Sequence, residues 1–200
     1  MSELKTDKIS PRTASGTITL GDSGDTFTVP SGATLAVASG ATISNAGTAS
    51  GFGGTNTPYF KAYRTGSQSV SSGVVTKILF QTEELDPSGI YDNATNYRMT
   101  VPAGAAGLWQ INAHFSAGSG SINSSNCAGY LYVNGAVRHY SLKYKTTGNM
   151  YWHNIALVTI FDLAEGDYVE VFVNVNGTNP EVQGSGNDNR ASFSGFKLVQ

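Results

Sequence analysis

The sequence predicts an all-β protein in which a short repetitive β-stalk precedes a two-sheet β-sandwich head, for which a jelly roll is one closed arrangement. Three observations support this class: an eight-residue repeat near the amino terminus, a series of short alternating strands after residue 58, and a composition poor in helix-forming charged residues. Charged residues make up only 13% of the chain and glycine occurs 24 times, which favours strands and turns. No segment has the periodicity of an amphipathic helix.

The eight-residue repeat predicts a stalk. Ser31-Gly32-Ala33-Thr34 recurs eight residues later as Ser39-Gly40-Ala41-Thr42, and the apolar positions in register are Phe27, Leu35 and Ile43. Ordering one repeat costs about 8–16 kcal/mol of backbone entropy, whereas its two or three apolar side chains contribute roughly 4–9 kcal/mol when they are buried. Because one copy cannot close this gap, the repeat predicts a homotrimer with Phe27, Leu35 and Ile43 in the stalk core.

The chain divides by composition into four parts. Glycine at a fixed phase (Gly24, Gly32 and Gly40) permits the tight turns of a narrow β-winding. The phase slips at Gly47, where a glycine-rich segment begins. The predicted parts are an amino-terminal anchoring arm (1–16), an octad-repeat β-stalk (17–48), a glycine-rich linker (49–58) and a jelly-roll head (59–200).

Nine strands are expected in the head. They are placed near 59–64, 74–80, 95–101, 107–116, 127–134, 137–142, 150–162, 167–175 and 191–199. Alternation predicts that the odd-numbered residues Trp109 to Phe115 form one face of their strand and that Val169, Val171, Val173 and Val175 form one face of theirs. Asn134-Gly135 predicts a two-residue hairpin turn.

Charge and cysteine content exclude several classes of partner. The formal net charge is −2, which gives no basic surface for nucleic acid. The sequence contains no run of eighteen apolar residues, so membrane insertion is not predicted. The start lacks the apolar run of a secretory signal, so we expect synthesis in the cytoplasm. Cys127 is the single cysteine, which excludes an intrachain disulfide.

The head resembles a known family on a series of short motifs that occur in order along the chain. These are Phe60-Lys-Ala62-Tyr63, Ile78-Leu79-Phe80, Tyr91-Asp92, Tyr97-Arg-Met-Thr-Val101-Pro102-Ala-Gly104, Gly107-Leu108-Trp109, Leu131-Tyr-Val-Asn134-Gly135, Leu163-Ala-Glu-Gly166-Asp167-Tyr168-Val169 and Ser192-Phe193-Ser194-Gly195-Phe196-Lys-Leu198. Together they resemble the globular head of the complement first-component q subunit, in the superfamily of tumour necrosis factor. The resemblance covers residues 59–200 and implies a ten-stranded jelly roll that assembles as a trimer, binds ligands through outer loops and has no catalytic role.

This chain departs from that family upstream of the head, where octads replace collagen Gly-X-Y triplets. The amino-terminal region is similar instead to structural and tail-fibre proteins of aquatic bacteriophages. The residues that carry this second resemblance are Ser2-Glu3-Leu4-Lys-Thr-Asp-Lys-Ile-Ser-Pro-Arg12, Leu20-Gly21-Asp22-Ser23-Gly24-Asp25 and Val29-Pro30-Ser31-Gly32. It implies a virion location and an arm that binds other virion proteins.

Catalytic and metal sites are not expected. Gly21-Asp22-Ser23-Gly24 matches the sequence around a trypsin-like serine, but the octads around it contain no protease domain, so we expect a turn. His114, His139 and His153 all lie in the head, where we expect structural roles. No cofactor is predicted. Calcium is the open alternative, because Asp22 with Asp25, or Asp188 in its Asx-rich turn, offers oxygen ligands.

The candidate ligand-binding residues lie in the stretch from His139 to His153. Aromatic rings alternate there with lysine and asparagine, a pattern suited to glycan or protein ligands. The residues selected are Lys143, Tyr144, Asn149 and Tyr151. The alternative is that the aromatic side chains of this stretch pack the sandwich or a trimer interface.

Together these features predict a bacteriophage fibre protein, a tail fibre or spike, that attaches to a glycan or protein of the host surface by multivalent binding. The alternative is an architectural capsid or tail decoration protein that binds no receptor. An enzyme is not expected, because the acidic residues near the head loops lack the spacing of a catalytic carboxylate pair.

Overall fold

The chain divides into two compact units, Met1–Phe52 and Gly53–Gln200. The computed structural model describes residues 18–20, 22–42, 58–119, 126–144, 151–185 and 190–198. Within these residues there are thirteen strands and no helix, which confirms the predicted all-β class. None of the described segments is a helix able to cross a membrane. The predicted arm (1–16) and all of the predicted linker except Pro58 lie outside the described residues.

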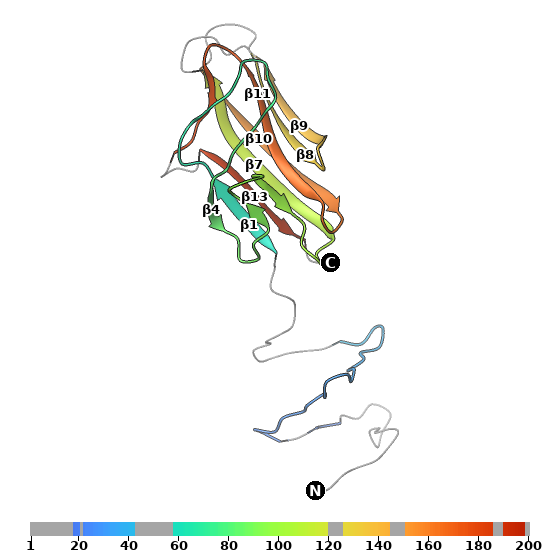
Figure 1. The fold of residues 1–200 in the computed structure, drawn as a ribbon. Coiled ribbons are helices and arrows are strands. Elements are labelled where there is room, and N and C mark those ends of the chain that lie inside the picture. Colours follow the sequence, from blue (N-terminus) through green and yellow to red (C-terminus); the bar gives the residue numbers. More distant parts are fainter. Residues whose placement is uncertain are drawn as a thin grey trace. The chain divides into compact units, whose positions relative to one another are not determined.

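Sheet A is an antiparallel sheet built around the long strand β7, Gly107–Ser119 (Figure 1). One edge of β7 pairs along its length with β10, and the other edge pairs with β13 and, nearer Ser119, with β12. β1 and β4 follow beyond β13, and β2 pairs with β12. The bounds are β1 Tyr59–Tyr63, β2 Gln68–Ser69, β4 Thr82–Leu85, β10 Trp152–Leu163, β12 Pro180–Val182 and β13 Ala191–Lys197.

Sheet B is the second antiparallel layer, in the order β5, β6, β11, β8 and β9, with β3 paired to β11. Its strands are β3 Thr76–Lys77, β5 Tyr91–Asp92, β6 Arg98–Thr100, β8 Asn126–Val133, β9 Ala136–Tyr144 and β11 Tyr168–Asn176. The predicted hairpin turn between β8 and β9 is confirmed, because Asn134 and Gly135 have φ values of 52° and 77°. Two positive φ values are what a type I′ turn requires.

The core lies between the two sheets. The predicted inner faces are confirmed: Trp109, Ile111, Ala113 and Phe115 on β7 are all buried, as are the four alternating valines of β11. The Trp109 ring nitrogen Nε1 donates to the carbonyl of Ala105 at 3.1 Å, so the indole is buried with its polar atom satisfied. The layers are therefore held together by the residues that alternation selects.

Four short strands (β2, β4, β5 and β12) are absent from the sequence prediction. Each has two to four residues, too few for alternation to register. The strand predicted at 74–80 is reduced to Thr76–Lys77, and Val74 and Val75 precede it as exposed loop residues. Their apolar character suggested strand, but the chain turns there, at Gly73, which has a φ of 74°.

The repeat of the first unit appears as a series of identical turns. Asp25, Ala33 and Ala41 each donate a backbone N–H at 3.0 Å to the carbonyl three residues earlier. Gly24, Gly32 and Gly40 take positive φ values of 95°, 83° and 81° in these turns, as the glycine phase predicted. No strand is formed by residues 18–20 and 22–42 of this single chain.

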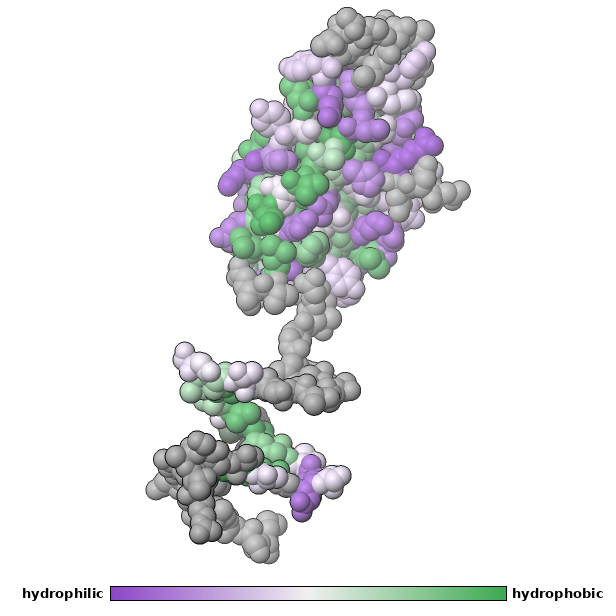
Figure 2. Space-filling view, turned by 180° about the vertical axis from the view of Figure 1, so that it is seen from behind, coloured by the Kyte–Doolittle hydropathy of each residue, from purple (hydrophilic) through white to green (hydrophobic). Residues whose placement is uncertain are grey.

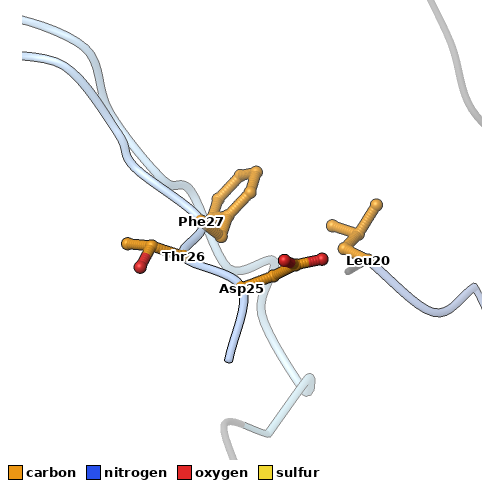
Figure 3. A pocket seen from close by; sticks show the side chains of 4 residues that line it. All are labelled: Leu20, Asp25, Thr26 and Phe27. Atoms are coloured by element: carbon orange, nitrogen blue, oxygen red, sulfur yellow. The ribbon is translucent and has the colours of Figure 1, made fainter. Parts of the chain in front are cut away.

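The apolar positions of the repeat are exposed in one copy of the chain (Figure 2). Phe27 is 65% exposed and Leu35 is 64% exposed, while Ile43 lies outside the described residues. An open hollow of about 350 Å³ is lined by Leu20, Asp25, Thr26 and Phe27, and Leu20 and Phe27 lie on either side of the Asp25 carboxylate (Figure 3). In a single copy of the chain, the described apolar side chains of the repeat therefore remain largely exposed to solvent.

Candidate functional site

The strand register brings five residues to one end of the head, which we call the loop end. They are Ser119, Asn126, Tyr144, Tyr151 and Thr178. β7 ends where β10 begins, and Ser119 donates its N–H at 2.8 Å to the carbonyl of Tyr151. Asn126 pairs with Tyr144 on β9, and the Ser119 hydroxyl donates to the carbonyl of Thr178. The backbones are so close that a Cβ on Gly118 would lie 1.9 Å from the Tyr151 carbonyl oxygen. This end lies opposite Tyr59, where the first strand of the head begins.

Three of the four predicted ligand-binding residues, Lys143, Tyr144 and Tyr151, lie at the loop end, and Asn149 lies outside the described residues. Tyr144 is 68% exposed and Tyr151 is 44% exposed, so both rings are accessible. Lys143 pairs with Cys127, whose side chain faces the core, so alternation places Lys143 and Tyr144 on opposite faces of β9. The structure therefore brings these residues to one end but divides them between two faces.

The histidines have structural surroundings. Nδ1 of His114 lies 2.9 Å from the hydroxyl oxygen of Ser192 on the neighbouring strand β13. Only 5% of Ser192 is exposed, so this hydroxyl is not accessible to a substrate. His153 is 3% exposed within β10, and His139 is half-buried on β9. Ser23 and Gly24 form the turn that the sequence predicted for the Gly-Asp-Ser-Gly motif.

Two of the acidic residues that suggested calcium, Asp22 and Asp25, take part in a turn. The Asp25 carboxylate accepts the Asp22 N–H at 2.8 Å, and Asp188 lies outside the described residues. Asp92 has a pKa well below its usual range because its carboxylate accepts the backbone N–H groups of Thr95 and Ala94. Across the described ranges, no group of three or more His, Cys, Asp or Glu side chains is placed to hold a metal ion.

Cys127 is buried between the sheets, and this burial raises the pKa of its thiol to about 12. The thiolate is the reactive form, so its fraction near neutral pH is about a thousandfold below that of an exposed cysteine. We expect iodoacetamide to modify the native protein very slowly and the urea-unfolded protein rapidly, as followed by intact mass. Equal rates in the two states would contradict this burial.

The outer face of sheet A is the feature that sequence reasoning missed. Its cross-strand rows are Ile160–Gln110–Phe196–Tyr59, Val158–Asn112–Ser194–Lys61 and Ala156–His114–Ser192–Tyr63. Val158 is 59% exposed and Ile160 is 54% exposed, and Leu108 adds a further apolar side chain. Lys61 is the only lysine, arginine, aspartate or glutamate in these rows, and its Nζ lies 2.8 Å from a carboxylate oxygen of Glu84. This face therefore combines exposed aliphatic side chains on β10 with mostly polar side chains on β7, β13 and β1, and Asp162, opposite Leu108, adds an exposed carboxylate.

The signal for this face is present in the sequence of β10. Residues 155–161 read Ile-Ala-Leu-Val-Thr-Ile-Phe, an almost continuous apolar run. Such a run is typical of a strand that is covered on both faces. Ile155 and Leu157 face the core, so the outward Val158 and Ile160 are left for a second contact.

The comparisons with known proteins concern the head. In sequence, the chain matches no family model and no curated protein. The globular domain of zebrafish complement 1qA protein superposes with a TM-score of 0.51 at 13% identity, covering 72% of this chain and 99% of that domain. Murine APRIL superposes with a TM-score of 0.51 at 11% identity, covering 70% of this chain and 98% of its own. The head is therefore a jelly roll with the fold of the complement q-subunit head and of tumour necrosis factor-like proteins, as its motifs predicted.

Proposed function

We propose that this chain is a homotrimeric fibre protein of a bacteriophage virion whose jelly-roll head attaches to the host surface. The observation that carries the proposal is the outer face of sheet A, where Val158 and Ile160 are more than half exposed. Neighbouring exposed aliphatic side chains on one sheet face mark an interaction surface. A homotrimer covers this face, because each copy contributes the same surface to a closed ring.

The exposed repeat supports the same assembly. Phe27 and Leu35 occupy equivalent positions in successive turns and are exposed to nearly the same extent, 65% and 64%. Val29 and Val37 lie two residues further on and are also exposed, at 38% and 44%. In an extended segment, positions two apart share a face. Three copies wound together bury this face, and the head holds them in register.

The virion location rests on the amino-terminal resemblance to aquatic phage structural and tail-fibre proteins. In this proposal the arm, residues 1–16, binds other virion proteins, and the octads separate the arm from the head. The chain neither binds nucleic acid nor inserts into a membrane. It needs no cofactor and catalyses no reaction.

Attachment is proposed to take place at the loop end, through Lys143, Tyr144, Asn149 and Tyr151. Tyr144 and Tyr151 are accessible there, and exposed tyrosines suit contact with a glycan or protein. Three heads on one stalk bind multivalently, so weak individual sites yield firm attachment.

Gold-labelled antibody against the chain, applied to virions of the phage that encodes it, tests the location. We expect label on tail fibres or spikes and inhibition of adsorption by the purified protein. Label on the capsid without inhibition of adsorption would favour the second candidate, a decoration protein that uses the outer face of sheet A to bind neighbouring subunits. Absence of label from intact virions would contradict both functions.

A further inference from the structure

A continuous row of rings crosses the outer face of sheet B, on the layer opposite sheet A. Tyr140 on β9, Tyr130 and Tyr132 on β8 and Phe172 on β11 form this aromatic strip. The ring centroids of Tyr140 and Tyr130 are 6.3 Å apart, those of Tyr130 and Tyr132 are 6.4 Å apart, and those of Tyr132 and Phe172 are 4.3 Å apart. Register produces the row, because Tyr130 lies directly opposite both Tyr140 and Phe172.

The strip is accessible along its length. Tyr140 is 62% exposed, and Tyr130, Tyr132 and Phe172 are each half-buried by their neighbours in the row. Tyr144 lies on the same face of β9 as Tyr140 and extends the aromatic surface to the loop end. Rings that pack against one another keep fixed orientations, so the protein loses little side-chain entropy when a ligand stacks on them.

Positive charge accompanies the rings. The Arg98 guanidinium lies 4.1 Å from the ring centroid of Tyr168, and it has no acidic partner among the residues that the structure describes. Lys77 lies 5.6 Å from the Phe172 centroid and pairs with Glu170 at 2.5 Å. A guanidinium stacked on a ring presents its N–H groups at its edge, where they suit a carboxylate.

The strands of sheet B are more basic than the chain as a whole. The chain has a net charge of −2, yet cationic side chains outnumber acidic ones on these strands. The cationic residues are Lys77, Arg98, Arg138 and Lys143, and the acidic residues are Asp92 and Glu170. Asp92 is engaged by backbone N–H groups and Glu170 by Lys77. Lys143 lies on the opposite face of β9 and Lys77 pairs with Glu170, so Arg98 is the cation beside the strip that the proposal uses for an anionic ligand.

We propose that the aromatic strip binds an acidic polysaccharide. Sugar rings stack their apolar faces on Tyr140 and Tyr130, while Arg98 pairs with a carboxylate of the same glycan chain. Val158 and Ile160 give the outer face of sheet A exposed aliphatic side chains, whereas sheet B carries the aromatic strip beside Arg98, so the two faces suit different partners. This inference deepens the proposed attachment function, because it names the ligand class and adds a surface to the loop-end site.

Titration of the full-length protein with oligogalacturonate, oligomannuronate and hyaluronate oligosaccharides, followed by calorimetry, tests the strip. We expect at least one of these acidic glycans to bind, and the methyl-esterified form of that glycan to bind roughly tenfold more weakly, a ratio equivalent to about 1.4 kcal/mol. Tyr140→Ala is expected to lower the affinity about tenfold, whereas Tyr140→Phe, which keeps the ring, retains binding. Arg98→Ala is expected to remove the preference for the acid over the ester.

Lys197→Ala is the matched control for Arg98→Ala, because it removes a cation from β13 of sheet A, away from both the strip and the loop end. It is expected to leave glycan affinity unchanged. The strip proposal is overturned if none of the acidic glycans binds, or if Tyr140→Ala binds like the parent protein. Loss of binding in Lys143→Ala and Tyr151→Ala, with Tyr140→Ala binding like the parent protein, would overturn the strip and leave the proposed loop-end attachment intact.

Discussion

Replacing both Val158 and Ile160 by aspartate is expected to convert the protein from a trimer to a monomer. Both side chains lie on the outer face of β10, at 59% and 54% exposure in a single copy. Burying a valine or isoleucine fully contributes about 1.5–3 kcal/mol, and an unpaired carboxylate buried in its place costs several kcal/mol more. The change is outside the core, so the fold of each copy is expected to persist.

Light scattering after size exclusion measures this change directly. The parent protein is expected at three times 21.0 kDa and the double variant at 21.0 kDa. Val74→Asp with Val75→Asp is the matched control, because these valines are 52% and 42% exposed on the loop between β2 and β3. The control is expected to remain trimeric. A double variant of Val158 and Ile160 that stays trimeric would show that this face is not the interface.

Phe193→Ala is expected to destabilise the head by about 3–5 kcal/mol. Phe193 is fully buried on β13, and its ring centroid lies 4.8 Å from that of Phe60, 5.8 Å from that of Phe80 and 5.9 Å from that of Tyr91. These three rings come from β1, from the loop between β3 and β4 and from β5, and they cannot all move into the space left by alanine, so a cavity remains. The lost ring contacts add to the lost burial.

Urea unfolding at a fixed protein concentration checks this prediction, since assembly makes the midpoint depend on concentration. Phe193→Leu fills most of the volume and is expected to cost about half as much. If Phe193→Ala lowers the free energy of unfolding by less than about 1 kcal/mol, the average for point mutations, the surrounding rings have repacked to fill the space.

Much of the fold is predictable from the sequence because its long strands alternate. Leu108 to Phe115 alternates so regularly that the buried face of β7 can be assigned residue by residue, and Asn134-Gly135 determines the turn that sets the β8–β9 register. The short strands β2, β4, β5 and β12 depend on pairing partners that are distant in sequence. Their two to four residues carry no periodicity of their own.

The surfaces are less predictable than the core. Tyr130 and Phe172 are about forty residues apart in sequence, and only the β8–β11 register makes them neighbours. Lys143 and Tyr144 are adjacent in sequence, yet alternation places them on opposite faces of β9. The sequence of β10 contains an almost continuous apolar run, but periodicity alone does not distinguish such a run from a buried helical segment, nor does it say what covers the outer face.

The mass of the full-length protein in dilute solution is the measurement that tests the proposed assembly most directly. In the proposed assembly, three heads cover one another through sheet A and three copies of the repeat lie in register. The expected mass at micromolar concentration is therefore three times 21.0 kDa. A mass of 21.0 kDa would contradict the account, because Val158, Ile160, Phe27 and Leu35 would then remain exposed in the working molecule.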